Sequence, residues 1–366
     1  MDIINWWNNL NPLSNEEKGI LKKGLNHILS DRTEYIKQYG GKEEDYFLSD
    51  IPTFTEAEKF DILTDEFFNR MPFCNCNHTN KDLSFNVSAT SFINMLFNRY
   101  VDEDTLVISS DNEHPSVKNK LSECKNVLIL SHYDIIRRYN LDYIINASKQ
   151  YKKVFVYIIG TRNDTGEITP QKFFIDLKKE FIKNSIEHTL VLDDVQGMFV
   201  VPRDYTIFDY IIGTGHAMIT NFDLGILISN HYIGGYKAYN WGKWYLERLD
   251  ILLKRKDKMN MFNQVLEQYF SKDILKESRC LAQPLSSPAI FYMKLEDKEL
   301  DKDISVLLGN INLLVPDSSV SINTFIRLRS HWFLIDNTLL PKCIKAVKYI
   351  FEHNKLDKKE LEDIIC

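Results

Sequence analysis

Short, continuous apolar runs dominate the centre of the chain, and polar or helix-like segments separate them. Examples are T-L-V-I-S-S at 105–110, V-F-V-Y-I-I-G at 154–160 and T-L-V-L-D at 189–193. Runs of this length without polar alternation are typical of strands buried on both faces, and their alternation with helical patterns predicts a mostly parallel sheet sandwiched by helices. Further strands are expected at 83–88, 126–131, 210–214 and 225–229, and a helix at 91–100.

The regions on either side have different patterns of apolar and polar residues, which suggests further structural units. An amphipathic run from Ser14 to Leu29 begins like an N-capped helix. A charged amphipathic helix is expected from Tyr245 to about Leu275, followed by strands at 289–295, 311–315 and 325–329 and a helix at 341–353. The predicted division is an N-terminal helical segment (1–80), a large domain (81–245), a linking helix (246–285) and a small C-terminal α/β domain (286–366).

Composition narrows the class of protein. A chain of 366 residues, 44% hydrophobic, can bury a large core. Its net charge is −6 with lysine and arginine spread along it, so no nucleic-acid partner is expected. We see no secretion signal and no apolar run of membrane-spanning length, and the six cysteines are scattered, which together predict a cytoplasmic protein without disulfides or a membrane partner.

Two elements close together carry the candidate chemistry. Asp193-Asp194-Val195-Gln196 follows an apolar strand, and Thr214-Gly215-His216-Ala217 precedes a strand that begins with glycine. These elements resemble the core of pyridoxal-phosphate (PLP) enzymes of the aspartate-aminotransferase fold (fold type I), class V aminotransferase-like, in which D-x-x-Q is followed by S-G-H-K. The resemblance implies PLP as cofactor, and it places Ala217 where the family has the lysine that forms the Schiff base.

The resemblance assigns several roles around the cofactor ring. Asp193 is expected to face the pyridine nitrogen, with Gln196 near the ring hydroxyl; the alternative is a polar turn that ends a strand. Asn163, before a T-G turn, is expected to bond the same hydroxyl, although N-D-T-G is also an ordinary turn signal. His114, in an E-H-x-x-V element, is expected to stack on the ring; the alternative is a surface or helix-capping residue.

Phosphate binding is expected where a strand meets a helix, because free amide groups and the helix dipole favour an anion there. Ser88-Ala89-Thr90 lies at such a junction and resembles the small-residue phosphate turn of the family. Thr214 and His216 occupy the positions that supply further phosphate contacts in S-G-H-K.

A late basic element resembles the one that binds the substrate carboxylate. Arg327 is followed four residues later by His331, as in the family, and Arg329 lies on the same strand face and could exchange roles with it. A guanidinium grips a carboxylate bidentately, which explains arginine at this place. The alternative is an exposed basic edge strand.

All these elements occur in the family's order and cover roughly residues 85 to 330. The resemblance implies an amino-acid substrate and a homodimer. Residues 313–319 resemble an approach seen in aminotransferases, so we expect aminotransferase-like chemistry, with a PLP-dependent lyase or replacement enzyme (elimination, retro-aldol) as the alternative. A desulfurase is disfavoured because residues 300–327 contain no cysteine. Cys74-x-Cys76-x-His78 could be half of a zinc site, but without a second ligand pair free loop cysteines are favoured.

Ala217 changes the expected mechanism. In the family the lysine amine anchors the cofactor and later moves the α-proton, and a methyl group can do neither. Either a lysine was replaced to trap an adduct of cofactor and substrate, or this is a natural lysine-less protein, including a cofactor-binding pseudoenzyme. Lys237 is the nearest downstream lysine but lies outside the expected turn.

Overall fold

A computed structural model of the chain describes residues 54–71, 75–86, 88–162, 167–198, 201–214 and 225–237, three strands between 291 and 328, and the helical positions 242, 246, 345, 349 and 353. Backbone contacts divide the chain into two compact units. One contains a seven-stranded sheet and the other a three-stranded sheet, and each is described by itself.

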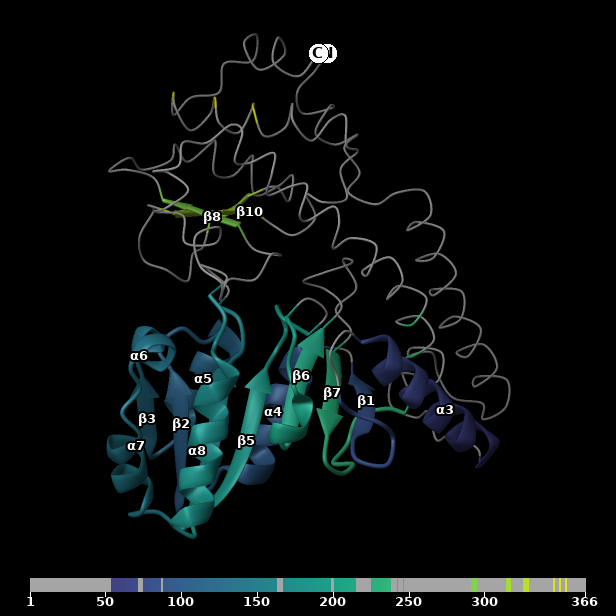
Figure 1. Cartoon of the computed structure of the whole chain (residues 1–366), viewed down its shortest axis with the longest axis horizontal. Coiled ribbons are helices and arrows are strands. Elements are labelled where there is room, and N and C mark those ends of the chain that lie inside the picture. The colour runs from purple at the N-terminus through teal and green to yellow at the C-terminus, as the bar shows by residue number, and fades with distance from the viewer. Residues whose placement is uncertain are drawn as a thin grey trace. The chain divides into compact units, whose positions relative to one another are not determined.

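The larger sheet has the strand order β1-β7-β6-β5-β4-β2-β3 (Figure 1). Only β7 runs against its two neighbours, and all other paired strands are parallel. The predicted mostly parallel sheet is therefore confirmed. The strands are β1 (Asp82–Asn86), β2 (Thr105–Ser110), β3 (Val127–Leu130), β4 (Lys153–Ile159), β5 (Glu187–Asp193), β6 (Tyr210–Thr214) and β7 (Gly225–Ser229).

Helices cover both faces of this sheet, with α4 (Ala89–Tyr100) behind it and α8 (Gln171–Lys183) in front of it in Figure 1. Phe92 and Leu96 of α4 pack with Val117 of α5 (Pro115–Glu123) on strand residues such as Phe155 and Val191. Four apolar side chains of α8 are buried, as expected of an amphipathic helix lying on a sheet. The remaining helices are α3 (Phe54–Arg70), α6 (His132–Arg137), α7 (Leu141–Ser148) and the short η2 (Tyr205–Ile207).

The order of connections changes direction between β2 and β4. The chain leaves β2 for β3 at the edge of the sheet and then returns to β4 on the other side of β2. The backbone ladder between β2 and β4 ends at the pair Ile108–Val156, although both strands continue beyond it. Open α/β sheets bind ligands at such a switch point, outside the carboxyl ends of the strands.

The smaller sheet has the order β8-β10-β9 and is antiparallel throughout. Its strands are β8 (Phe291–Lys294), β9 (Leu314–Pro316) and β10 (Phe325–Leu328), so the three strands expected near the C-terminus are confirmed. The expected helix at 14–29 and most of the linking helix lie outside the described residues. The domain boundaries stay a prediction.

Candidate functional site at the carboxyl edge of the larger sheet

Asp193 ends β5 and is buried, with only 3% of the residue exposed. Its Oδ2 accepts a hydrogen bond of 2.8 Å from the Tyr157 hydroxyl on β4, and its Oδ1 accepts one of 3.2 Å from the amide of Val195. Burial raises the pKa of Asp193, while the hydrogen bonds from Tyr157 and Val195 lower it. Each oxygen keeps a lone pair, so this carboxylate can receive a cationic N–H group.

His114 follows β2 and is exposed at the start of α5. Its Nδ1 accepts a 3.3 Å hydrogen bond from the amide of Ser116 and lies 2.7 Å from the Ser116 hydroxyl. The helix-capping alternative is therefore confirmed. The stacking role stays a prediction.

The predicted phosphate turn lies between β1 and α4. Ser88 is the N-cap of α4, and its Oγ accepts a 3.2 Å hydrogen bond from the amide of Ser91. Ala89 and Thr90 already belong to the first helical turn. The N-terminus of α4, capped by Ser88, therefore lies where the sequence predicts the anion site.

Gly225 brings this turn together with Thr214. A Cβ atom at Gly225 would lie 2.5 Å from the backbone oxygen of Ser88, so only glycine permits β7 to approach the turn this closely. Thr214 at the end of β6 is the strand partner of Gly225. The structure thus places Ser88 and Thr214, far apart in sequence, beside the same residue.

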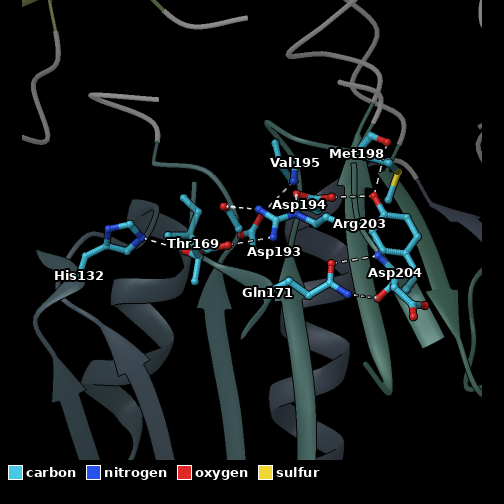
Figure 2. Close-up of polar contacts among 12 residues, drawn as sticks. His132, Thr169, Gln171, Asp193, Asp194, Val195, Met198, Arg203 and Asp204 are labelled. Carbon is cyan, nitrogen blue, oxygen red and sulfur yellow. Dashed lines mark hydrogen bonds and ion pairs between the residues drawn. The ribbon is translucent and has the colours of Figure 1, made fainter. Parts of the chain in front are cut away.

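A buried ion pair that the sequence did not reveal joins the loops after β4 and β5 (Figure 2). The guanidinium of Arg203 donates to Asp194 Oδ1 at 3.2 Å, to the carbonyl of Thr169 at 3.0 Å and to the carbonyl of Gly160. The Tyr205 hydroxyl donates to Asp194 Oδ2 at 2.6 Å. Burial raises the pKa of Asp194 to about 6, although Arg203 and Tyr205 oppose the shift, so the carboxylate is ionised at neutral pH.

The same network reaches the end of β3 through Thr169 (Figure 2). Its hydroxyl donates to the carbonyl of Ile159 at 2.5 Å and lies 2.9 Å from Nε2 of His132. Because a hydroxyl has one proton, Thr169 accepts from His132, whose Nε2 therefore carries a hydrogen. Side chains consequently connect the loops after β3, β4 and β5.

Several expected site residues cannot be placed beside these groups. Asn163, His216, Ala217 and Arg329 lie outside the described residues. Arg327 lies in β10, in the other compact unit. Gln196, by contrast, is described: it is half-buried in the turn after β5, three residues beyond Asp193.

Three residues of this edge, Glu113, Tyr157 and Arg203, were not among the expected site residues. Glu113 is part of the E-H element and could have been noticed, whereas Arg203 carries no local signal because its partners lie 9, 34 and 43 positions away.

Lys237 is engaged elsewhere in the fold. Its Nζ lies 2.9 Å from Oδ1 of Asp82, the first residue of β1, whereas the Ser88 turn follows the last residue of that strand. A strand of five residues spans on the order of 13 Å. Lys237 therefore lies at the end of β1 remote from the predicted phosphate turn.

The metal alternative gains no support from the described residues. His78 Nδ1 lies 2.5 Å from Asp65 Oδ2, and Cys74 lies outside the description. Within the described part of the chain no three potential ligands gather into a metal site. Among the same residues, no helix has the length and apolar character needed to cross a membrane.

No protein-family model matches the sequence, and neither does any curated protein. Solved structures do match. A NifS-like protein from Rickettsia africae aligns with a TM-score of 0.61 and 16% identity over 89% of this chain and 95% of that chain. Histidinol-phosphate aminotransferase from Clostridium acetobutylicum aligns with a TM-score of 0.57 and 12% identity over 90% of this chain and 96% of that chain. A third match is a lysine-to-alanine variant of serine palmitoyltransferase from S. paucimobilis with bound PLP–myriocin aldimine. It aligns with a TM-score of 0.56 and 14% identity over 89% of this chain and 83% of that chain.

At these identities the likeness establishes the fold. The chain has the mixed α/β fold of the PLP-dependent fold type I enzymes, with a mostly parallel seven-stranded sheet and helices. The described residues also fit PLP chemically. A buried carboxylate without a cationic partner among its hydrogen bonds suits a pyridinium, and a helix N-terminus packed against a glycine suits a phosphate.

Proposed function

We propose that this chain binds PLP at the carboxyl edge of the larger sheet and descends from, or is a form of, an enzyme that acts at the α-carbon of an amino acid. The observation that carries the proposal is the buried Asp193, held by Tyr157 and Val195 next to the switch point of a fold shared with PLP enzymes. When bound, PLP supplies an electron sink for carbanion chemistry.

The residues of the chain divide the work of binding. Asp193 keeps the proton on the pyridine nitrogen, because a buried anion favours a cation beside it. The Ser88 turn and Thr214 hold the phosphate, and His114 packs against the flat face of the ring. Arg327 or Arg329 binds the substrate carboxylate.

The reaction that these groups support best is aminotransferase-like. A PLP-dependent lyase or replacement reaction is the alternative, since it needs the same binding groups. By the same resemblance, we propose a cytoplasmic homodimer.

Ala217 sets the limit of activity in this form of the chain. Without an amine at this position, PLP is held only by non-covalent contacts, and the α-proton has no lysine to receive it. This property suits an inactivated form of an enzyme that retains its adduct. A natural PLP-binding pseudoenzyme has the same property, and restoring the amine distinguishes the two.

The test is the ultraviolet–visible spectrum of Ala217→Lys with PLP, before and after a panel of amino acids is added. We expect a visible band absent from free PLP that shifts with one amino acid. Ala217→Gln, similar in size but without an amine, is the matched control and should give no such band. PLP retention on dialysis with neither band nor turnover would favour the pseudoenzyme, and absence of PLP binding in every form would refute the proposal.

A further inference from the structure

Glu113 bridges the gap where β2 and β4 separate. Its side chain is buried, and its Oε1 accepts hydrogen bonds from the hydroxyl of Ser110 at 2.5 Å and the amide of Ile159 at 3.0 Å. Ser110 ends β2 and Ile159 ends β4, both beyond the last backbone pair of these strands. The Ser109 hydroxyl adds a 2.7 Å hydrogen bond to the carbonyl of Tyr157. Side chains thus replace the backbone ladder at the switch point.

The second oxygen of Glu113 has a different environment. Oε2 is buried without a hydrogen-bond partner among the described residues, and none of the donors to Oε1 is a cation. The ionisable groups that act on Glu113 from the neighbouring strands are acids, Asp193 on β5 and Tyr157 on β4. An unpaired carboxylate buried beside a second carboxylate is costly, so the neutral acid is the stable form. Burial, reinforced by the charge of Asp193, raises the pKa of Glu113 to about 8.

We propose that Glu113 is a positioning residue of the PLP site: a neutral carboxylic acid that holds the ends of β2 and β4 together and leaves Asp193 as the charged member of the acidic group. The inference rests on the function proposed above. His114 is the next residue after Glu113, and Tyr157, which donates to Asp193, is two residues before Ile159 on β4. The Glu113 side chain therefore holds the backbone next to His114, the expected stacking group, and the strand that carries Tyr157, the donor to Asp193.

Protonation is tested without any cofactor. The carboxyl has a pKa of about 8 in the folded chain against an ordinary value of 4.5, so the folded state binds the extra proton between these limits. The stabilisation that this proton gives the folded state is fully present below pH 4.5 and is lost as the pH rises toward about 8. We expect the unfolding constant of the parent chain, relative to that of Glu113→Gln, to rise by up to about tenfold per pH unit across this window. A ratio that stays constant with pH would overturn the proposal.

Positioning is tested by PLP affinity, measured by equilibrium dialysis at neutral pH. Glu113→Gln keeps a neutral acceptor for Ser110 and Ile159 and should bind PLP within about twofold of the parent chain. Glu113→Ala removes the bridge and should bind at least about tenfold more weakly, since small displacements of binding groups are costly. Equal losses in both variants would show that the carboxylate charge is needed and would overturn the inference.

The two proposals fail in distinguishable ways. If the parent chain binds no PLP, the proposed function fails, while the pH dependence of unfolding still reports whether Glu113 is protonated. If Glu113→Ala does not fold, as judged by circular dichroism, the comparison of Glu113→Gln with the parent chain still decides whether a neutral group suffices.

Discussion

Asp193 and Asp194 are neighbouring buried carboxylates whose surroundings give them different tasks. Asp194 is satisfied inside the protein by Arg203 and Tyr205. Among the described residues, Asp193 receives a hydroxyl and an amide but no cation, which is what the proposed pyridinium partner requires. Environment, rather than residue type, thus distinguishes the two carboxylates.

Removing Arg203 should destabilise the fold strongly. Arg203→Met leaves the buried Asp194 carboxylate without its cationic partner and takes one donor from each of the carbonyls of Gly160 and Thr169. Removing one partner of a buried ion pair typically costs about 3–5 kcal/mol. Urea unfolding measures the loss. Arg138→Met is the matched control because Arg138 pairs with Asp134 at the surface, where its side chain is 78% exposed, and should cost less than about 1 kcal/mol. Equal stabilities for the two variants would contradict a structural ion pair.

At the scale of elements, the proposed phosphate site lies at the junction of β1, α4 and β7. The helix begins immediately after the Ser88 cap, and the antiparallel β7 starts at the residue that must come closest to it. A side chain on that strand residue would push the helix start away. The antiparallel strand β7 can therefore approach the start of α4 because Gly225 has no Cβ atom.

Gly225→Ala should damage this junction more than a similar change nearby. The new Cβ would meet the carbonyl group of Ser88 at 2.5 Å and the nitrogen of Ala89 at 2.7 Å, all backbone atoms. We expect a loss of about 1–3 kcal/mol in unfolding free energy and weaker PLP binding. Gly213→Ala, in the adjacent strand, meets mainly the mobile end of Met198 and is the control. Urea unfolding measures the stability of the two variants, and isothermal titration measures their PLP affinity. Equal stability and equal affinity in the two variants would contradict the expectation.

The elements themselves were largely predictable because continuous apolar runs mark strands buried on both faces. Details at their ends were not. The strand expected at 83–88 is Asp82–Asn86, and the helix expected from 91 begins at Ala89, because the Ser88 cap ends one element and starts the next. Asp193 could be found from its local pattern. The roles of Arg203 and Glu113 could not, since they arise from partners that folding brings together.

For the whole molecule, the sheet order concentrates candidate chemistry at one edge. Asp193, His114, Ser88 and Thr214 come from segments spread over more than a hundred residues, yet all follow or end strands at the carboxyl edge. None of these groups depends on the side chain at position 217. Under the proposed function, PLP binding is therefore expected although Ala217 carries no amine.

The proposed homodimer gives a test at this scale. A single chain has a mass of 43.0 kDa, so static light scattering should report twice that value at micromolar concentration. The resemblance places the site near the subunit interface, and dilution into a monomer should therefore weaken PLP binding. A monomer that binds PLP with undiminished affinity would contradict the homodimer while leaving the binding site intact.

The contacts of Arg203 also have a consequence for the order of folding events. Its guanidinium is satisfied only after the segments containing Gly160, Thr169 and Asp194 have docked. Before that moment, dehydrating the charge brings no compensation, so this ion pair should form after the rate-limiting barrier. Substitutions at Arg203 would then accelerate unfolding and hardly slow refolding. The buried ion pair would therefore lengthen the lifetime of the native state by slowing its unfolding.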